Sequence, residues 1–178
     1  MRLKAWLQRY EPEIATRWLQ ELKAGSWSLP EEGGNVLETV ATHLVSFLPS
    51  CFGEKREAGM DAWRDAAHLY GSLGLRRGLA TGEVMEEFQL LRHVIFRLFL
   101  LEPASDALGS EVPRDVSPLD LLTLNRVLDM GVTGANVAYV DDLFFAHLQG
   151  SGVPEGITTE LAEEMERQLR ALRKELEG

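Results

Sequence analysis

Residues 78–95 read GLATGEVMEEFQLLRHVI, and this stretch indicates the fold class of the whole chain. Its large apolar residues recur at intervals of three and four, the spacing of one face of an α-helix. They are Val84, Phe88, Leu91 and Ile95. Most of the chain has this spacing, and no segment alternates with the period of two that is typical of a strand. We therefore predict an all-α fold, a bundle of about six helices around one core, globin-like arrangements included.

The same spacing predicts helices on both sides of this stretch. The first starts at Leu3 and ends at Ala24, and Pro12 inside it predicts a break with a second start near Glu11. Caps and breakers predict the others: a helix capped by Asn35 with Glu38 and ended by Pro49, one over residues 57–77 closed by Gly78, one from Thr81 to near Glu102, one from Ser117 toward His147, and one from about Thr158. The predicted core includes Trp18, Leu44, Phe88, Leu91, Ile95, Leu121 and Leu128.

The chain is predicted to divide into one helical domain and a separate helix. The domain covers residues 1–148 and includes a surface loop over 103–116, which is rich in proline and small polar residues. Residues 149–156 hold three glycines and a proline, so we predict a linker there. Residues 157–178 follow as an amphipathic helix.

The last helix carries a narrow apolar stripe with the spacing of a coiled coil, which consists of Ala162, Met165, Leu169, Leu172 and Leu176. Charged residues cover the rest of its surface. A stripe of two heptads is compatible with packing back on the bundle or with pairing to a second chain. The glycine-rich linker favours the second, so we predict a parallel homodimer in which two copies of Leu169 approach each other.

Composition excludes several classes of protein. The 178 residues include 28 acidic against 18 Lys plus Arg, a net charge of −10, which argues against a nucleic-acid binder. No apolar run approaches the roughly 20 residues of a membrane span, and the N-terminus lacks the pattern of a signal peptide. Cys51 is the only cysteine, so an intrachain disulfide and a cysteine-cluster metal site are both excluded. We predict a cytoplasmic location.

No recognisable catalytic or metal-binding motif emerges. A helical di-iron site needs two Glu-x-x-His motifs, and the nearest approach is a single Asp65-x-x-His68. His93 shares a polar helix face and is predicted to be solvated. Cys51 has no base near it in sequence and is predicted to be buried filler. The glycine pairs Gly71/Gly74 and Gly131/Gly134 are predicted to mark close helix crossings rather than ligands. We therefore expect no enzyme activity, no metal and no cofactor.

Two charged residues border the apolar stripe of the opening stretch. Glu87 and Arg92 flank it on opposite sides and are five residues apart, too far around the helix to pair with each other. Each should therefore find a charged or hydrogen-bonding partner on another helix.

The pattern Glu87-Phe88-x-x-Leu91-Arg92-x-x-Ile95, nine residues after Gly78, resembles the central motif of the RsbRD N-terminal domain family. Two flanking stretches agree with that family: Ile14-Ala-x-Arg17-Trp18-Leu19, and Asn125-Arg126-x-Leu128-Asp129 through Ala138-Tyr139. The resemblance covers roughly residues 10–145 in the right order. Where many members carry His and Arg before the motif glycine, this chain has Tyr70 and Gly74, and Phe88 replaces a commoner tyrosine.

The resemblance implies an all-helical sensory or interaction domain that is usually dimeric and has no catalysis of its own. Such domains precede output modules in stressosome proteins, histidine kinases and PucR-like regulators, so a chain ending at Gly178 would be an N-terminal module or a stand-alone relative. The motif residues would then serve structure or signalling, and a homodimer and a downstream output domain would be the partners. The alternative is a helical domain that binds a small molecule or haem, as a globin-like carrier does.

Overall fold

The computed structural model describes residues 2–25, 31–100, 116–150, 152 and 156–178. Within these residues it contains helices and no strand, which confirms the predicted all-α bundle. The elements are α1 (Leu3–Ala24), α2 (Glu31–Phe47), the short 3-10 helix η1 (Leu48–Cys51), α3 (Arg56–Arg76), α4 (Thr81–Leu100), α5 (Pro118–Leu148) and α6 (Thr159–Glu177). The predicted loop over 103–116 lies almost entirely outside the described residues, as does part of the predicted linker.

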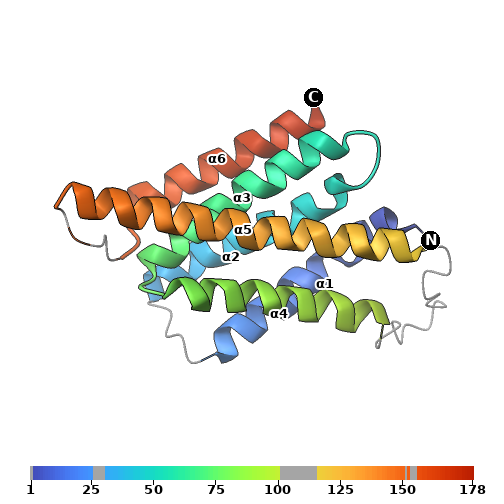
Figure 1. Cartoon of the computed structure of the whole chain (residues 1–178), viewed down its shortest axis with the longest axis horizontal. Coiled ribbons are helices and arrows are strands. Elements are labelled where there is room, and N and C mark those ends of the chain that lie inside the picture. Colours follow the sequence, from blue (N-terminus) through green and yellow to red (C-terminus); the bar gives the residue numbers. More distant parts are fainter. Residues whose placement is uncertain (1, 26–30, 101–115, 151, 153–155) are drawn as a thin grey trace.

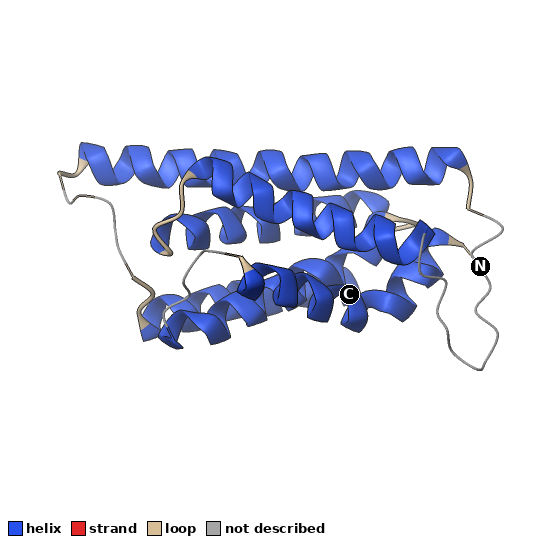
Figure 2. Ribbon diagram, turned by 90° about the horizontal axis from the view of Figure 1, so that it is seen from below, coloured by secondary structure: helices blue, strands red, loops and turns tan. Residues whose placement is uncertain are grey.

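Helix α3 is the centre of the bundle. It packs against α5 most extensively and also against α2, α4 and α6, while α1 packs against α2 and α4 (Figure 1). Helix α5 is the longest element and runs along one outer edge of the molecule (Figure 2). Six of the seven residues named as core by sequence are buried. Leu121, on the first turn of α5, is only partly buried.

The predicted break at Pro12 is wrong, because α1 continues through it. An internal proline removes one backbone hydrogen bond and costs about 3 kcal/mol. Apolar side chains on both sides of Pro12 are buried, Trp6 before it and Trp18 after it among them, so both halves are held against the core. Burial of this size, at about 1.5–3 kcal/mol for each large side chain, outweighs the cost of the proline.

The predicted cap at Asn35 is also wrong, because α2 begins at Glu31 and places Asn35 in its second turn. The reason lies in the burial of Val36 and Leu37. Buried backbone amides need partners, and in a helix these are the carbonyl groups four residues earlier. The amides of Val36 and Leu37 reach such carbonyl groups only if the helix already includes about residue 32. The helix must therefore begin before Asn35. The start of α5 was predicted correctly, since Ser117 is the cap, Pro118 is the first helical residue, and Ser117 and Asp120 form a capping box.

Two glycines let α3 and α5 approach closely, as predicted. A Cβ atom on Gly71 of α3 would lie 2.0 Å from the backbone oxygen of Ala135 on α5. A Cβ on Gly131 of α5 would lie 2.8 Å from the ring of Trp63. Neither distance is compatible with a side chain, so these glycines set the separation of the two helices.

The substitution Gly71→Ala is therefore expected to destabilise the protein by about 1–3 kcal/mol or more, because the backbone of α5 must move away. The matched control is Gly82→Ala in α4, where a Cβ would meet nothing within 4 Å. There the gain in helix propensity is expected to leave stability unchanged or raise it by up to about 1 kcal/mol. Urea denaturation measures both. Equal stabilities of the two variants would contradict the close crossing.

The C-terminal helix packs on its own bundle, so the predicted pairing of its stripe with a second chain is wrong. Leu169 is 0% exposed and Met165 is also buried, both within the core of the same chain. The other stripe residues, Ala162, Leu172 and Leu176, are partly buried against that core. Helices α2 and α3 supply the surface that they cover. Two heptads gain more by covering an existing apolar surface than by forming a marginal isolated coiled coil.

Candidate functional site

A buried ion pair joins α4 to the end of α3. Glu87 is 0% exposed, and the side chain of Arg77 is 2% exposed. Arg77 donates two hydrogen bonds to the carboxylate, from Nη2 to Oε1 at 2.7 Å and from Nη1 to Oε2 at 2.9 Å. The hydroxyl of Tyr70 donates a third, to Oε2 at 2.7 Å. We call Glu87, Arg77 and Tyr70 the Glu87 network.

The turn between α3 and α4 places these three side chains together. Gly78 has a φ of +74°, the left-handed conformation that glycine adopts without strain. The amide of Leu79 donates to the carbonyl of Gly74, and the amide of Gly78 to that of Leu75, which is a Schellman motif. The chain therefore reverses at once, and Arg77, the last residue before the turn, points back at the carboxylate on α4.

Helices α1 and α5 are also tied to this turn. The indole Nε1 of Trp18 donates to the backbone oxygen of Glu87 at 2.8 Å. The hydroxyl of Tyr139 donates to the backbone oxygen of Leu79 at 2.7 Å. The Trp18 ring stacks on Tyr70, with 5.3 Å between ring centroids. Four helices thus converge on the α3–α4 turn.

Burial raises the pKa of Tyr70 well above its usual range, and the negative charge of Glu87 raises it further. Burial alone would lower the pKa of Arg77, but its hydrogen bonds to Glu87 and the nearby negative charge outweigh that effect. Its pKa is therefore raised, and the guanidinium keeps its positive charge inside the core. The network is thus a charged pair with a neutral phenol beside it.

The structure brings together five of the residues that carry the sequence resemblance. Glu87 and Arg92 each have a partner from outside their own helix, as predicted. Those that meet at the α3–α4 turn are Trp18, Gly78, Glu87, Phe88 and Tyr139. Leu91 and Ile95, further along α4, are buried in the core. Arg92 and Asp129 form a separate ion pair between α4 and α5 that is 25% and 56% exposed.

Sequence reasoning missed Arg77 and Tyr70 as partners of Glu87. Arg77 suited the carbonyl end of its helix, and Tyr70 was noted only as a departure from the family pattern. The available signal was Glu87 itself, because an acid at the edge of an apolar stripe needs a cation close by. An arginine directly before a turn-forming glycine is well placed to supply it.

Replacing Glu87 by Gln is expected to cost about 3–5 kcal/mol of stability, because Arg77 is left as an uncompensated buried charge. The matched control is Arg92→Ala, also on α4 and also removing a contact between helices. Its pair is partly exposed to solvent, so the expected loss is only about 1 kcal/mol. Chemical denaturation distinguishes the two. Similar losses in both variants would mean that burial of the Glu87 pair has no energetic weight.

Cys51 is buried, and its thiol faces the backbone oxygens of Gly59 at 3.5 Å and Phe47 at 3.7 Å. Burial raises the pKa of the Cys51 thiol to about 12. The reactive form of cysteine is the thiolate, so this residue is not a nucleophile at neutral pH.

The free energy of unfolding is expected to fall as the pH rises above about 8.5, because the unfolded chain then loses the Cys51 proton while the folded chain keeps it. One such group contributes a slope of up to about 1.4 kcal/mol per pH unit, and above pH ~10 Tyr70 adds to it in the same direction. Urea titrations between these two pH values test the cysteine alone. A Cys51→Ala variant should show a flatter dependence there, and identical slopes would contradict the assignment.

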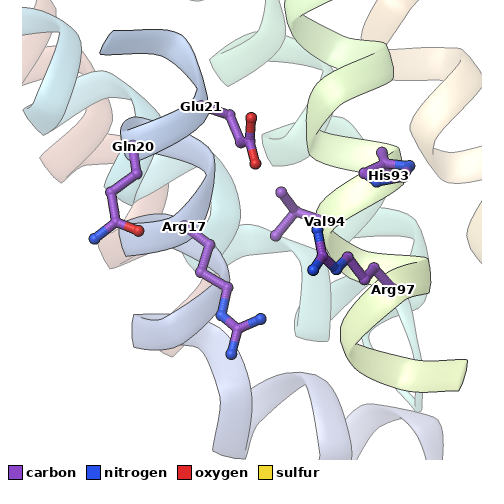
Figure 3. A pocket seen from close by; sticks show the side chains of 6 residues that line it. All are labelled: Arg17, Gln20, Glu21, His93, Val94 and Arg97. Atoms are coloured by element: carbon purple, nitrogen blue, oxygen red, sulfur yellow. The ribbon is translucent and has the colours of Figure 1, made fainter. Parts of the chain in front are cut away.

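A second candidate site is a groove of about 360 Å³ between α1 and α4. Arg17, Gln20 and Glu21 line it from α1, and His93, Val94 and Arg97 from α4. Figure 3 shows the guanidinium groups of the two arginines and the Glu21 carboxylate facing the space between the helices. Arg17 also pairs with Glu13 at 2.7 Å. Such a lining suits the binding of a small anion, and none of these side chains is a nucleophile beside a base.

Among the described residues, no group of three or more His, Cys, Asp or Glu side chains lies where it could hold a metal ion. None of the helices described is long and apolar enough to cross a membrane. No protein-family model matches the chain, and no curated protein and no solved structure matches it. The resemblance to the RsbRD N-terminal domains therefore stays a prediction.

Proposed function

We propose that this chain is a non-catalytic sensory and dimerisation module of a bacterial signal-transduction protein, of the kind found at the N-terminus of stressosome regulators and histidine kinases. In this proposal it works in the cytoplasm and passes its signal to an output domain or a partner protein. The observation that supports it most is a continuous connection from the Glu87 network to α6.

That connection runs through the C-terminal end of α3. The amide of Gly156, just before α6, donates to the backbone oxygen of Arg76 at 3.0 Å. Arg76 is bonded to Arg77, whose guanidinium holds the Glu87 carboxylate. A rearrangement that released Arg77 would therefore shift the backbone of Arg76, to which Gly156 is hydrogen-bonded just before α6.

A buried charged network suits a switch better than it suits stability. Replacing a buried ion pair by apolar residues of similar volume is often neutral or stabilising, because both charges lose their hydration. A signal needs two arrangements of a packed core that differ by only a few kcal/mol. The Glu87 network supplies a contact that is either complete or broken, at the point where four helices meet.

Amide hydrogen exchange tests this coupling. In Glu87→Gln, amides of α6 are expected to exchange at least five-fold faster relative to the buried amides of α2, because the anchor at Arg76 loosens. The control Arg92→Ala should leave α6 unchanged. Faster exchange at the α3–α4 turn with α6 unaltered would contradict the proposal, and so would a uniform acceleration of every helix.

The groove between α1 and α4 favours a second function, a helical domain that binds a small molecule. Its arginines point to an anionic ligand. Thermal unfolding with added phosphate or citrate tests this, and a rise in melting temperature that disappears in Arg97→Gln would support it. A visible absorption band in the purified protein would instead favour the haem-binding form of this alternative.

A further inference from the structure

Large exposed hydrophobic side chains concentrate on one helix. Ten such residues are found in the described part of the chain, and eight of them belong to α5. Phe144, for example, is 57% exposed. Scattered single apolar residues are normal on a protein surface, but a concentration of this kind marks an interaction site.

Most of these residues lie on one face of α5, which we call the outer α5 face. Its apolar members recur at helical spacing at both ends of the helix: Leu119, Leu122, Val137, Val140, Phe144 and Leu148. The opposite face of α5 holds buried residues such as Leu124 and Leu128, which pack into the bundle. A helix that is apolar on opposite faces is normally covered on both. In Figure 2 the helix lies at the edge of the molecule, and no other helix of the described residues lies beyond it.

We propose that two copies of this chain pair through the outer α5 face, with their α5 helices antiparallel about a twofold axis near Thr133. The inference deepens the proposed function and rests on its dimerisation component. It replaces the parallel pairing of the C-terminal helix, whose stripe is already covered within one chain.

The two ends of the face are complementary to each other in this arrangement. In a twofold interface residue i contacts residue j, and j contacts i. An axis between Thr133 and Gly134 sets Leu119 opposite Leu148 of the partner subunit. The same axis sets Leu122 opposite Phe145 of the partner subunit, an exposed residue at the border of the outer α5 face, since both pairs of numbers have the same midpoint.

Charge selects the same direction. Arg126 and Asp141 are both exposed on α5 and share that midpoint, so each faces the other across an antiparallel interface, twice in the dimer. Parallel pairing would bring two copies of Arg126 together and two copies of Asp141 together. Like charges juxtaposed across an interface are unfavourable.

The size of the face suits a dimer of moderate affinity. Residues 119–148 span about 44 Å at a rise of about 1.5 Å per residue. With a helix diameter of about 10–12 Å, the strip covers roughly 500 Å² on each subunit. The total of roughly 1,000 Å² reaches the lower limit for a specific interface. A lipid surface fits less well, because membrane-surface helices are rich in Lys and Arg and this chain has a net charge of −10.

Light scattering of the full chain after size-exclusion chromatography tests the interface. A dimer of about twice the 19.9 kDa chain mass is expected. The double variant Val140→Glu/Phe144→Glu should be monomeric, with helical content unchanged. The control Met85→Glu replaces an exposed hydrophobic residue of α4 and should remain dimeric.

The direction is tested by mixing two single-cysteine variants, Leu119→Cys and Leu148→Cys, each with Cys51 replaced by Ala. The mixture should form disulfide-linked dimers under mild oxidation, while neither variant should do so alone. Crosslinking of Leu119→Cys with itself would overturn the antiparallel arrangement.

Two other results would overturn the inference in distinguishable ways. A dimer that survives Val140→Glu/Phe144→Glu would place the interface elsewhere and leave the proposed function standing. A wild-type chain that is monomeric at tens of micromolar would overturn both this interface and the dimerisation component of the proposed function. Binding of that monomer to vesicles of anionic lipid would show that lipid covers the face instead.

Discussion

The bidentate contact between Glu87 and Arg77 is the constraint on which the arrangement of the helices depends. A carboxylate in an apolar core is tolerable only if a cation reaches it, and only the tight turn at Gly78 brings Arg77 to that position. The turn also holds α4 against α3. Trp18 attaches α1 to the backbone oxygen of Glu87, and Tyr139 attaches α5 to the backbone oxygen of Leu79. Four helices thus meet around one charge pair.

Local sequence rules were sufficient for the secondary structure wherever one strong signal acted alone. The three-four spacing of residues 84–95 predicted α4, and Ser117 with Pro118 predicted the start of α5. These rules are insufficient where tertiary burial opposes them. Pro12 should interrupt a helix, but the packing of Trp6 and Trp18 on the core is worth more than the lost hydrogen bond. The sequence therefore predicts which segments are helical better than it predicts whether a helix is interrupted.

The sequence shows that Glu87 needs a cation beside it, but it does not show which residue supplies that cation. The position of Glu87 beside an apolar stripe showed that a cation must approach it, but several arginines were available. Selecting Arg77 requires the geometry of the turn, which pattern spacing does not contain. The stripe of α6 shows the same limit, because Leu169 would suit a second chain or its own bundle equally well in sequence. Only the position of α2 and α3 decides between them.

The central claim is that Glu87 and Arg77 act as one buried unit, and a double-mutant cycle measures this directly. Free energies of unfolding for wild type, Glu87→Gln, Arg77→Met and the double variant give the coupling energy between the two side chains. We expect a coupling of more than about 2 kcal/mol, because either single change leaves the other charge buried and unpaired. Additive losses, with a coupling below about 0.5 kcal/mol, would contradict the claim that the two side chains act as one unit.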